Sequence, residues 1–336
     1  MRRLSAIVIL VVLPFDSVAD EPAPNVKETI NRGLAFLTRD NLVWKKTKQC
    51  AECHHAPFTI WALNEGKKRG YTVDEKELAD LTAWAVAKEI PAKTAAKQTN
   101  HEQLDVNEAP LLLALAIEAG DGKSSREGLE KLLGSVVKDQ NPDGAWKLSY
   151  EFRPIGSSPE TLTTLALLAL RAPNAPDMGK EGKVARDKGL EWLRSASSDE
   201  EPQAVALRLI LWRRLGQPAR EWGPLAKKLL GAQNADGGWG QTKEAKSDAY
   251  ATGQALYALA EAGVKPDDMA VRKAQSFLAK TQRQDGGWAM ASRAIMRDGK
   301  PPKNLEPITH AGSAWAVMGL VRSSSIDVKS ENALGK

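Results

Sequence analysis

The sequence lacks the patterns that mark the commonest enzyme sites. It contains no phosphate-binding glycine loop and no Ser/His/Asp order, and its Gly-Gly-Trp-Gly stretch at 237–240 is not preceded by the strand that a dinucleotide site requires. Lysine and arginine are scattered and are not interleaved with aromatics, so a net charge of +5 does not indicate nucleic-acid binding. The sequence therefore names no reaction, and whether the protein is an enzyme stays open.

Long apolar runs are missing beyond the N-terminus, so no transmembrane segment is predicted. Residues 1–19 fit an export signal, in which Arg2 and Arg3 precede a run of about ten apolar residues, Leu4–Leu13. That run is too short to span a bilayer, and small residues lead up to an expected cleavage after Ala19. We therefore expect an exported protein, periplasmic or extracellular, with a linker at 20–25 and a flexible polar tail at 323–336.

One pattern is repeated, and it decides the fold class. The stretch Gln-x-x-Asp-Gly-x-Trp occurs three times. Its fixed positions are Gln140, Asp143, Gly144 and Trp146, then Gln233, Asp236, Gly237 and Trp239, then Gln282, Asp285, Gly286 and Trp288. The last two tryptophans are 49 residues apart and the first two are 93 apart, close to two such periods. A fixed period of this length indicates a repeat architecture.

The repeated residues suit a structural role. Asp-Gly is turn chemistry, because glycine accepts a positive φ and aspartate bonds its own backbone. The following indole can fold back against the preceding helix, and the glutamine can bond free peptide groups of the loop. Since buried tryptophans and turn glycines usually serve structure, we predict a clamp at the helix end and no catalytic role for these twelve residues.

Six apolar helices rich in small residues are predicted, each preceded by a more charged one. The apolar helices are expected at 56–64, 109–120, 161–171, 204–215, 249–263 and 311–320. The charged ones are expected to start near residues 26, 76, 126, 184, 221 and 271. Small residues let backbones approach closely in an inner ring, whereas Lys, Arg and Glu suit an outer ring facing water. The predicted fold is all-α, a single (α/α)6 toroid of six outer–inner helix pairs over residues 26–322.

The three repeats resemble the QW motifs of the squalene/oxidosqualene cyclase and protein prenyltransferase superfamily. The resemblance extends over about residues 26–322 and implies the same toroid. It does not extend to the known chemistries: the Asp-x-Asp-Asp acid of the cyclases is absent, and Asp267-Asp268 follow a proline in a loop. At the zinc-binding histidine of the prenyltransferases this chain has Ala251. Neither activity is therefore expected. In architecture the chain is most similar to exported, planctomycete-type squalene-cyclase-like proteins that carry a Cys-x-x-Cys-His-His motif.

Only two cysteines are present, and both fall in Cys50-Ala51-Glu52-Cys53-His54-His55. Cys-x-x-Cys-His is the attachment pattern of c-type haem, in which the histidine becomes an axial iron ligand. Export agrees with this interpretation. Two alternatives stay open: the thiolates and histidines could bind zinc or another metal, or the cysteines could form a disulfide in an oxidising compartment.

The expected toroid places His310 close to this motif. Inner helices of a toroid run parallel, so their N-termini meet at one rim, and ring closure makes the first and last inner helices neighbours. His54 and His55 start the first, His310 opens the last, and His101 precedes the second. We expect either a haem c held by Cys50, Cys53 and His54, with His310 or His55 as distal ligand, or a metal held by Cys50, Cys53, His54, His55 and His310.

Three functions follow as expectations. The first is a redox or binding protein that carries this cofactor and meets a redox protein partner. The second is a binding protein or enzyme for an isoprenoid or other apolar ligand in a central cavity, because an apolar inner ring can enclose such a pocket. The third is a scaffold that presents the toroid surface to another exported protein.

Overall fold

The computed structural model describes residues 25–51, 54–89, 105–120, 126–149, 154–171, 175–196, 201–293 and 300–325. These ranges contain twelve α-helices and no β-strand. Within them no helix combines the length and the apolar character that crossing a membrane requires. The expected export signal, most of the expected linker and tail, Cys53 and His101 lie outside the described residues.

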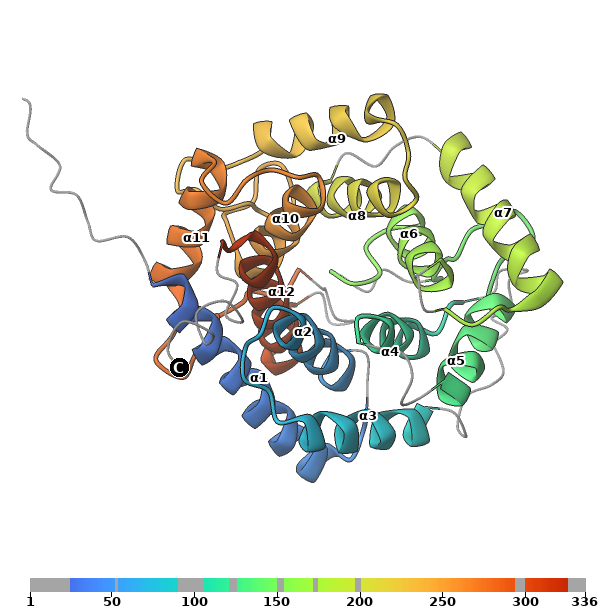
Figure 1. The fold of residues 1–336 in the computed structure, drawn as a ribbon, viewed down its shortest axis with the longest axis horizontal. Coiled ribbons are helices and arrows are strands. Elements are labelled where there is room, and N and C mark those ends of the chain that lie inside the picture. Colours follow the sequence, from blue (N-terminus) through green and yellow to red (C-terminus); the bar gives the residue numbers. More distant parts are fainter. Residues whose placement is uncertain are drawn as a thin grey trace, which may run out of the picture.

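The helices form two concentric rings (Figure 1). The outer ring consists of α1 (Val26–Lys48), α3 (Glu75–Glu89), α5 (Arg126–Lys138), α7 (Gly179–Ser195), α9 (Ala219–Gly231) and α11 (Met269–Thr281). The inner ring consists of α2 (Ala56–Lys68), α4 (Glu108–Glu118), α6 (Pro159–Leu170), α8 (Pro202–Arg214), α10 (Ala249–Glu261) and α12 (Glu306–Ser323). The ring closes where α12 packs against α2 and α1 packs against α11. The predicted all-α toroid of six outer–inner pairs is confirmed.

The two rings differ in how their surfaces are buried. Outer helix α5 buries only one stripe, Leu129, Leu132, Leu133 and Val136, while its other faces carry charge. Inner helix α6 buries every residue from Glu160 to Leu170. A helix with one apolar stripe faces water on its other side, and one that is apolar all round must be enclosed. The sequence pattern therefore sorts the helices into rings.

The repeated motif joins consecutive elements through the same hydrogen bonds in each copy. In the first copy, Trp146 Nε1 donates to Val136 O of the preceding outer helix at 2.7 Å, and its backbone N donates to Thr163 Oγ1 of the following inner helix at 3.0 Å. Gln140 Nε2 donates to Ala185 O of the next outer helix at 2.8 Å. Each copy thus connects an outer helix, an inner helix and the next outer helix.

The third copy closes the ring on the N-terminal helix. Gln282 Nε2 donates to Thr29 O of α1 at 2.9 Å, and Arg39 Nη2 of α1 donates to Asp285 O at 2.8 Å. Gly286 has φ +93°, and a Cβ there would lie 2.3 Å from Arg32 O. Only glycine fits such a contact at such a φ. The motif therefore fixes α1 against α11, two hundred and more residues away along the chain.

A candidate cofactor site at the histidine cluster

The seam where the ring closes brings the sequence-predicted histidines together. His54 and His55 precede α2, and His310 lies in α12, which packs against α2. The last inner helix begins at Glu306, earlier than the expected residue 311, because Pro307 suits a first helical turn. His310 consequently lies one turn inside the helix and does not open it.

The three histidine side chains and two neighbours, Asp40 and Thr59, form a chain of polar contacts. His310 Nδ1 lies 2.7 Å from Asp40 Oδ2, and His310 Nε2 lies 2.9 Å from Thr59 Oγ1. His55 Nε2 lies 3.4 Å from the same Asp40 oxygen, and His55 Nδ1 lies 3.0 Å from His54 Nδ1. We name Asp40, His54, His55, Thr59 and His310 the histidine cluster. One carboxylate oxygen at its centre faces two ring nitrogens.

Aromatic stacking fixes the plane of the central imidazole. The ring of His55 stacks on Trp44, with centroids 3.9 Å apart and planes 10° apart, and on His310, with centroids 4.2 Å apart and planes 29° apart. Trp44 is held in turn, because its Nε1 donates to Cys50 O at 3.2 Å. The Cys50 loop and the His55 ring are therefore positioned by one indole from α1.

Burial and charge set the protonation states of the cluster. His55 is 1% exposed and His310 is fully buried. Burial lowers the pKa of His55 to about 3 and also lowers the pKa of His310, so both rings are neutral at pH 7. Burial alone would raise the pKa of Asp40, but hydrogen bonds from His310 and His55 outweigh it and hold that pKa below its usual range. An ionised carboxylate thus lies between two neutral imidazoles.

Asp40 was not predicted from the sequence, and it is the central residue. It lies among charged and polar residues of a long outer helix, where an acid is ordinarily a solvated surface group. The signal that could have found it is positional. An outer helix and its inner partner run antiparallel across a short loop, so a residue two turns before the end of α1 lies beside the start of α2. Its side chain is 33% exposed, which makes it the member of the cluster nearest solvent.

The remaining predicted site residues are placed as follows. Cys50 lies in the loop after α1 and is half-buried, and His54 is buried. Cys53 lies outside the described residues, so its position relative to the cluster is not described. The structure thus brings His54, His55 and His310 together, with Cys50 linked to the same region through Trp44.

Other polar groups at the same rim serve the inner helices or stand apart from the cluster. Asp248 caps α10 by accepting from Ala251 N at 2.9 Å, and Ser158 caps α6 by accepting from Thr161 N at 3.2 Å. Glu108, in the first turn of α4, is different: burial raises its pKa to about 7, and nearby Asp105 adds to the increase.

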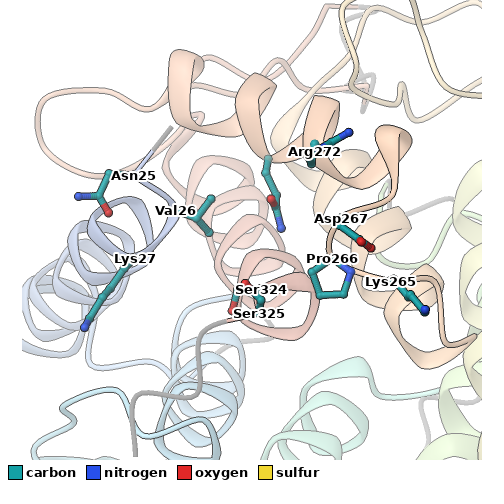
Figure 2. Close-up of a pocket in the computed structure, with 10 residues that line it drawn as sticks. Asn25, Val26, Lys27, Lys265, Pro266, Asp267, Arg272, Ser324 and Ser325 are labelled. Atoms are coloured by element: carbon teal, nitrogen blue, oxygen red, sulfur yellow. The ribbon is translucent and has the colours of Figure 1, made fainter. Parts of the chain in front are cut away.

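A groove lies at the other end of α12. Figure 2 shows it between the start of α1, the loop before α11 and the residues that follow α12, with Lys27, Lys265, Arg272 and Asp267 on its walls. Its volume is about 700 Å³, and none of the sequence-predicted site residues lines it. The groove and the histidine cluster are therefore separate features.

Comparison with known proteins gives a sequence match over part of the chain and a fold match over most of it. The profile of the squalene-hopene cyclase C-terminal domain matches residues 245–333. A squalene–hopene cyclase of Bradyrhizobium diazoefficiens is 34% identical over 99 residues, and a probable squalene–hopene cyclase of Sinorhizobium fredii is 30% identical over 99 residues. Each match covers 30% of this chain but only 15% of the relative.

Solved structures match over almost the whole chain. The type II terpene cyclase MstE from Scytonema has a TM-score of 0.56 at 14% identity, covering 88% of this chain and 97% of that one. A protein from Actinoplanes has a TM-score of 0.57 at 14% identity, covering 89% and 99%. A polysaccharide lyase has a TM-score of 0.57 at 10% identity, covering 88% and 96%. At these identities the likeness shows the fold alone. The chain therefore has the terpenoid-cyclase-like α/α-toroid fold, and its C-terminal part is similar in sequence to squalene-hopene cyclases.

Proposed function

We propose that this chain is an exported, cyclase-like toroid that carries a c-type haem on Cys50, Cys53 and His54 and acts in electron transfer or binding, without cyclase or prenyltransferase activity. The observation that carries the proposal is the orientation of His54. Its Nδ1 lies 3.0 Å from His55 Nδ1, and His55 lies in turn against the Asp40 carboxylate. An axial histidine has a hydrogen-bonding partner on the ring nitrogen that does not bind the metal, because that partner fixes the tautomer and the ring plane.

The residues present fit this role through one consistent set of protons. His54 donates its Nδ1 proton to His55 Nδ1, and His55 donates its Nε2 proton to Asp40. His310 donates its Nδ1 proton to the same carboxylate and accepts from Thr59 at Nε2. These tautomers follow from the geometry of the hydrogen bonds. They leave Nε2 of His54 as the nitrogen that would bind iron.

His310 receives a different role from the distal position expected from the sequence. Both of its ring nitrogens have partners in Asp40 and Thr59. We therefore propose that His310 holds Asp40 in place, and through it His55. A bound haem c would supply reversible one-electron chemistry, whose potential depends on the axial ligand and on the hydrogen bonds around it. In this arrangement His55 orients the axial ligand His54, and the ionised carboxylate of Asp40 lies on the other side of the His55 ring.

The test is a visible absorption spectrum of the exported protein, co-expressed with a haem-c maturation system. Soret and α bands that survive denaturation would establish covalent haem and make a redox protein the expected partner. The Cys50→Ser/Cys53→Ser double variant, prepared in the same way, is the matched control and should be colourless. A colourless wild-type protein would remove haem c, and elemental analysis would then distinguish a metal on the cysteines and histidines from a disulfide.

Export is a separate part of the proposal with its own test. We propose cleavage after Ala19, so the mature chain should begin at Asp20. Fractionation of expressing cells followed by N-terminal sequencing checks both points. A protein that stays in the cytoplasm with residues 1–19 attached would contradict them, and it would also weaken the haem assignment, because haem c is attached outside the cytoplasm.

A second candidate function is the binding of an isoprenoid or another apolar ligand inside the ring. It is favoured by aromatic side chains on three neighbouring inner helices, which gather around Trp315 of α12. The ring centroids of Trp61, Tyr257 and Phe58 lie 5.2, 5.9 and 6.2 Å from that of Trp315. The Scytonema cyclase has been solved with geranylgeranyl dihydroxybenzoate bound. Native mass spectrometry should detect a co-purified lipid in the wild-type protein and less of it in the Trp61→Ala variant. Lipid-free protein from several preparations would contradict this function.

A further inference from the structure

Three residues of the histidine cluster, Asp40, His55 and His310, bring metal-ligating atoms close together without any contribution from the cysteines. One ligand atom of each lies within 4.8 Å of the other two. Asp40 Oδ2 lies 3.4 Å from His55 Nε2 and 2.7 Å from His310 Nδ1. The geometry points to a binding site for a single divalent transition-metal ion of the zinc class, with Asp40, His55 and His310 as its three protein ligands. This site differs from the cysteine-containing set that the sequence suggests.

The distances suit an ion placed between the carboxylate oxygen and the two ring nitrogens, with each imidazole carrying its proton on its other nitrogen. In a tetrahedral site with bonds of 2.0–2.1 Å, adjacent donor atoms are roughly 3.3 Å apart. His55 Nε2 and Asp40 Oδ2 already lie 3.4 Å apart. His310 Nδ1 and Asp40 Oδ2 lie 2.7 Å apart, so Asp40 must move away from His310 by a fraction of an ångström. Asp40 can make this adjustment because its side chain is partly exposed, whereas the two rings are packed.

The surroundings hold both imidazoles in place for such an ion. Thr59 Oγ1 lies 2.9 Å from His310 Nε2, the nitrogen that faces away from the ion. His55 presents its other nitrogen to His54 and is stacked on Trp44. Metal-ligating histidines regularly make this kind of outer contact, which orients the ring. The exposed side of Asp40 provides the entry path and leaves room for water as a fourth ligand.

The donor set decides the class of metal. Two imidazole nitrogens and one carboxylate oxygen suit zinc and its first-row neighbours, whereas magnesium and calcium prefer oxygen ligands alone. Three protein ligands with a fourth position left to water are typical of catalytic zinc, while structural zinc sites have four protein ligands. The position is also different from that of the prenyltransferase zinc, whose matching residue here is Ala251 on α10.

This inference does not rest on the proposed haem, although His55 links the two sites. With an ion on Nε2, the ring proton of His55 must lie on Nδ1, and the hydrogen bond to His54 then reverses direction. His54 would carry its own proton on Nε2, the nitrogen that iron would need. The two therefore require different positions of the His55 ring proton, so an ion in the Asp40 site disfavours the binding of iron to His54, and iron on His54 disfavours the ion. A protein without haem is the form in which the metal site should be tested.

The experiment uses the full chain with Cys50→Ser/Cys53→Ser, so that neither haem nor a thiolate can contribute. After treatment with a chelator, zinc is titrated by calorimetry and cobalt(II) by visible absorption. We expect one zinc per chain and the intense cobalt bands of a four- or five-coordinate site. Adding Asp40→Asn to this protein should weaken its affinity for zinc at least tenfold, and adding His310→Gln should have the same effect. Asp187→Asn, which removes an exposed carboxylate of α7, should change nothing.

Two results would overturn the assignment. One is the absence of zinc binding in the cysteine-free protein, which would show that Asp40, His55 and His310 do not bind zinc by themselves. The other is binding that Asp40→Asn leaves unchanged, which would place the ion elsewhere. Circular dichroism establishes that each variant is folded, and Asp40→Asn decides the matter if the buried His310 variant is not. A colourless wild-type protein would end the haem proposal and leave this one untouched, so the two can fail separately.

Discussion

A hydrogen-bonded carboxylate lies at each end of the inner-helix pair α2 and α12, but the partners of the two carboxylates differ. At the N-terminal ends of α2 and α12, one carboxylate faces two neutral imidazoles. At the C-terminal ends, Glu65 of α2 is 2% exposed and is bound by two nitrogens of a guanidinium: Arg322 Nε and Nη2 donate to it at 2.7 and 3.0 Å. Tyr257 Oη adds a third hydrogen bond at 2.9 Å.

This difference in partners indicates which carboxylate, Asp40 or Glu65, belongs to a site that can bind a ligand. A guanidinium is always protonated and has no lone pair to offer, so the Glu65 network can only hold helices together. A neutral imidazole can bind a metal ion through a ring-nitrogen lone pair while it keeps its proton on the other nitrogen, so the histidine cluster has a second possible occupant. The positive Arg side chains also suit the C-terminal ends of helices, where the backbone dipoles are negative. We therefore regard the Glu65 network as structural and the histidine cluster as functional.

The largest expected effect is the loss of stability when the Glu65 network is broken. Glu65→Gln should lower the free energy of unfolding by about 3 kcal/mol, because removing one partner of a buried pair leaves the other uncompensated. Arg322 is 26% exposed, which keeps the loss at the lower end of that range. Urea denaturation measures it. Glu261, whose Oε1 lies 3.5 Å from Arg322 Nη1, is 18% exposed, so Glu261→Gln is the matched variant with a smaller loss. Equal losses for the two would remove Glu65 as the centre of the network.

The same variant has a defined pH dependence. Burial raises the pKa of Glu65, but Arg322 outweighs burial, so the folded-state pKa lies below the ordinary value. A depressed pKa gives stability that is present above the unfolded-state pKa and is lost as the pH falls below it. The stability difference between wild type and Glu65→Gln should therefore be constant above pH 5 and shrink below pH 4.5. A difference that grew on acidification would contradict the sign.

A bound zinc ion should stabilise the protein through the histidine cluster, independently of the Glu65 network. At a zinc concentration one hundred times the dissociation constant, binding to the folded state alone adds about 2.7 kcal/mol to the free energy of unfolding. We expect this gain in the cysteine-free protein and in its Glu65→Gln derivative, since the Glu65 network contains no zinc ligand. The gain should be absent in its Asp40→Asn derivative. Thermal unfolding with and without zinc measures all three, and loss of the gain in Glu65→Gln would show that the two ends are not independent.

A third carboxylate, the half-buried Glu108, sharpens the comparison, because neither a guanidinium nor an imidazole is among the contributors to its pKa. Burial raises that pKa to about 7, so the folded state binds a proton more tightly than the unfolded state does. Stability is therefore lost as the pH rises from the ordinary value of 4.5 to about 7, and the loss is complete above that. Glu108→Gln should stabilise the protein by about 2 kcal/mol at pH 8 and by almost nothing at pH 4, the opposite trend to Glu65→Gln. Denaturation at both pH values measures this, and a destabilised variant at pH 8 would show that the carboxylate has a partner.

Much of the fold could be predicted from the sequence, because the period, the turn residues and the contrast between apolar and charged helices all agree. The outer helices begin within a few residues of their expected starts, except α7, which begins at Gly179 instead of near residue 184. The site could be predicted only in part. His54, His55 and His310 share a rim by topology alone. Asp40 could not be found in this way, since an aspartate on a solvated outer helix has no local signal, and only the packing of α1 against α2 and α12 makes it central.

The smallest expected effect concerns Asp40 itself and is the sharpest contrast with Glu65. Both are carboxylates that accept hydrogen bonds from two side chains, but Asp40 is 33% exposed and Glu65 is 2% exposed. In Asp40→Asn the amide oxygen can still accept from His310, and the buried rings stay neutral, so no charge is left without a partner. The loss of stability without metal should be about 1 kcal/mol, the usual contribution of one hydrogen bond. Urea denaturation of the metal-free protein measures it. A loss as large as that of Glu65→Gln would mean that Asp40 is a structural residue, and that the histidine cluster has been built for stability like the network at the opposite end.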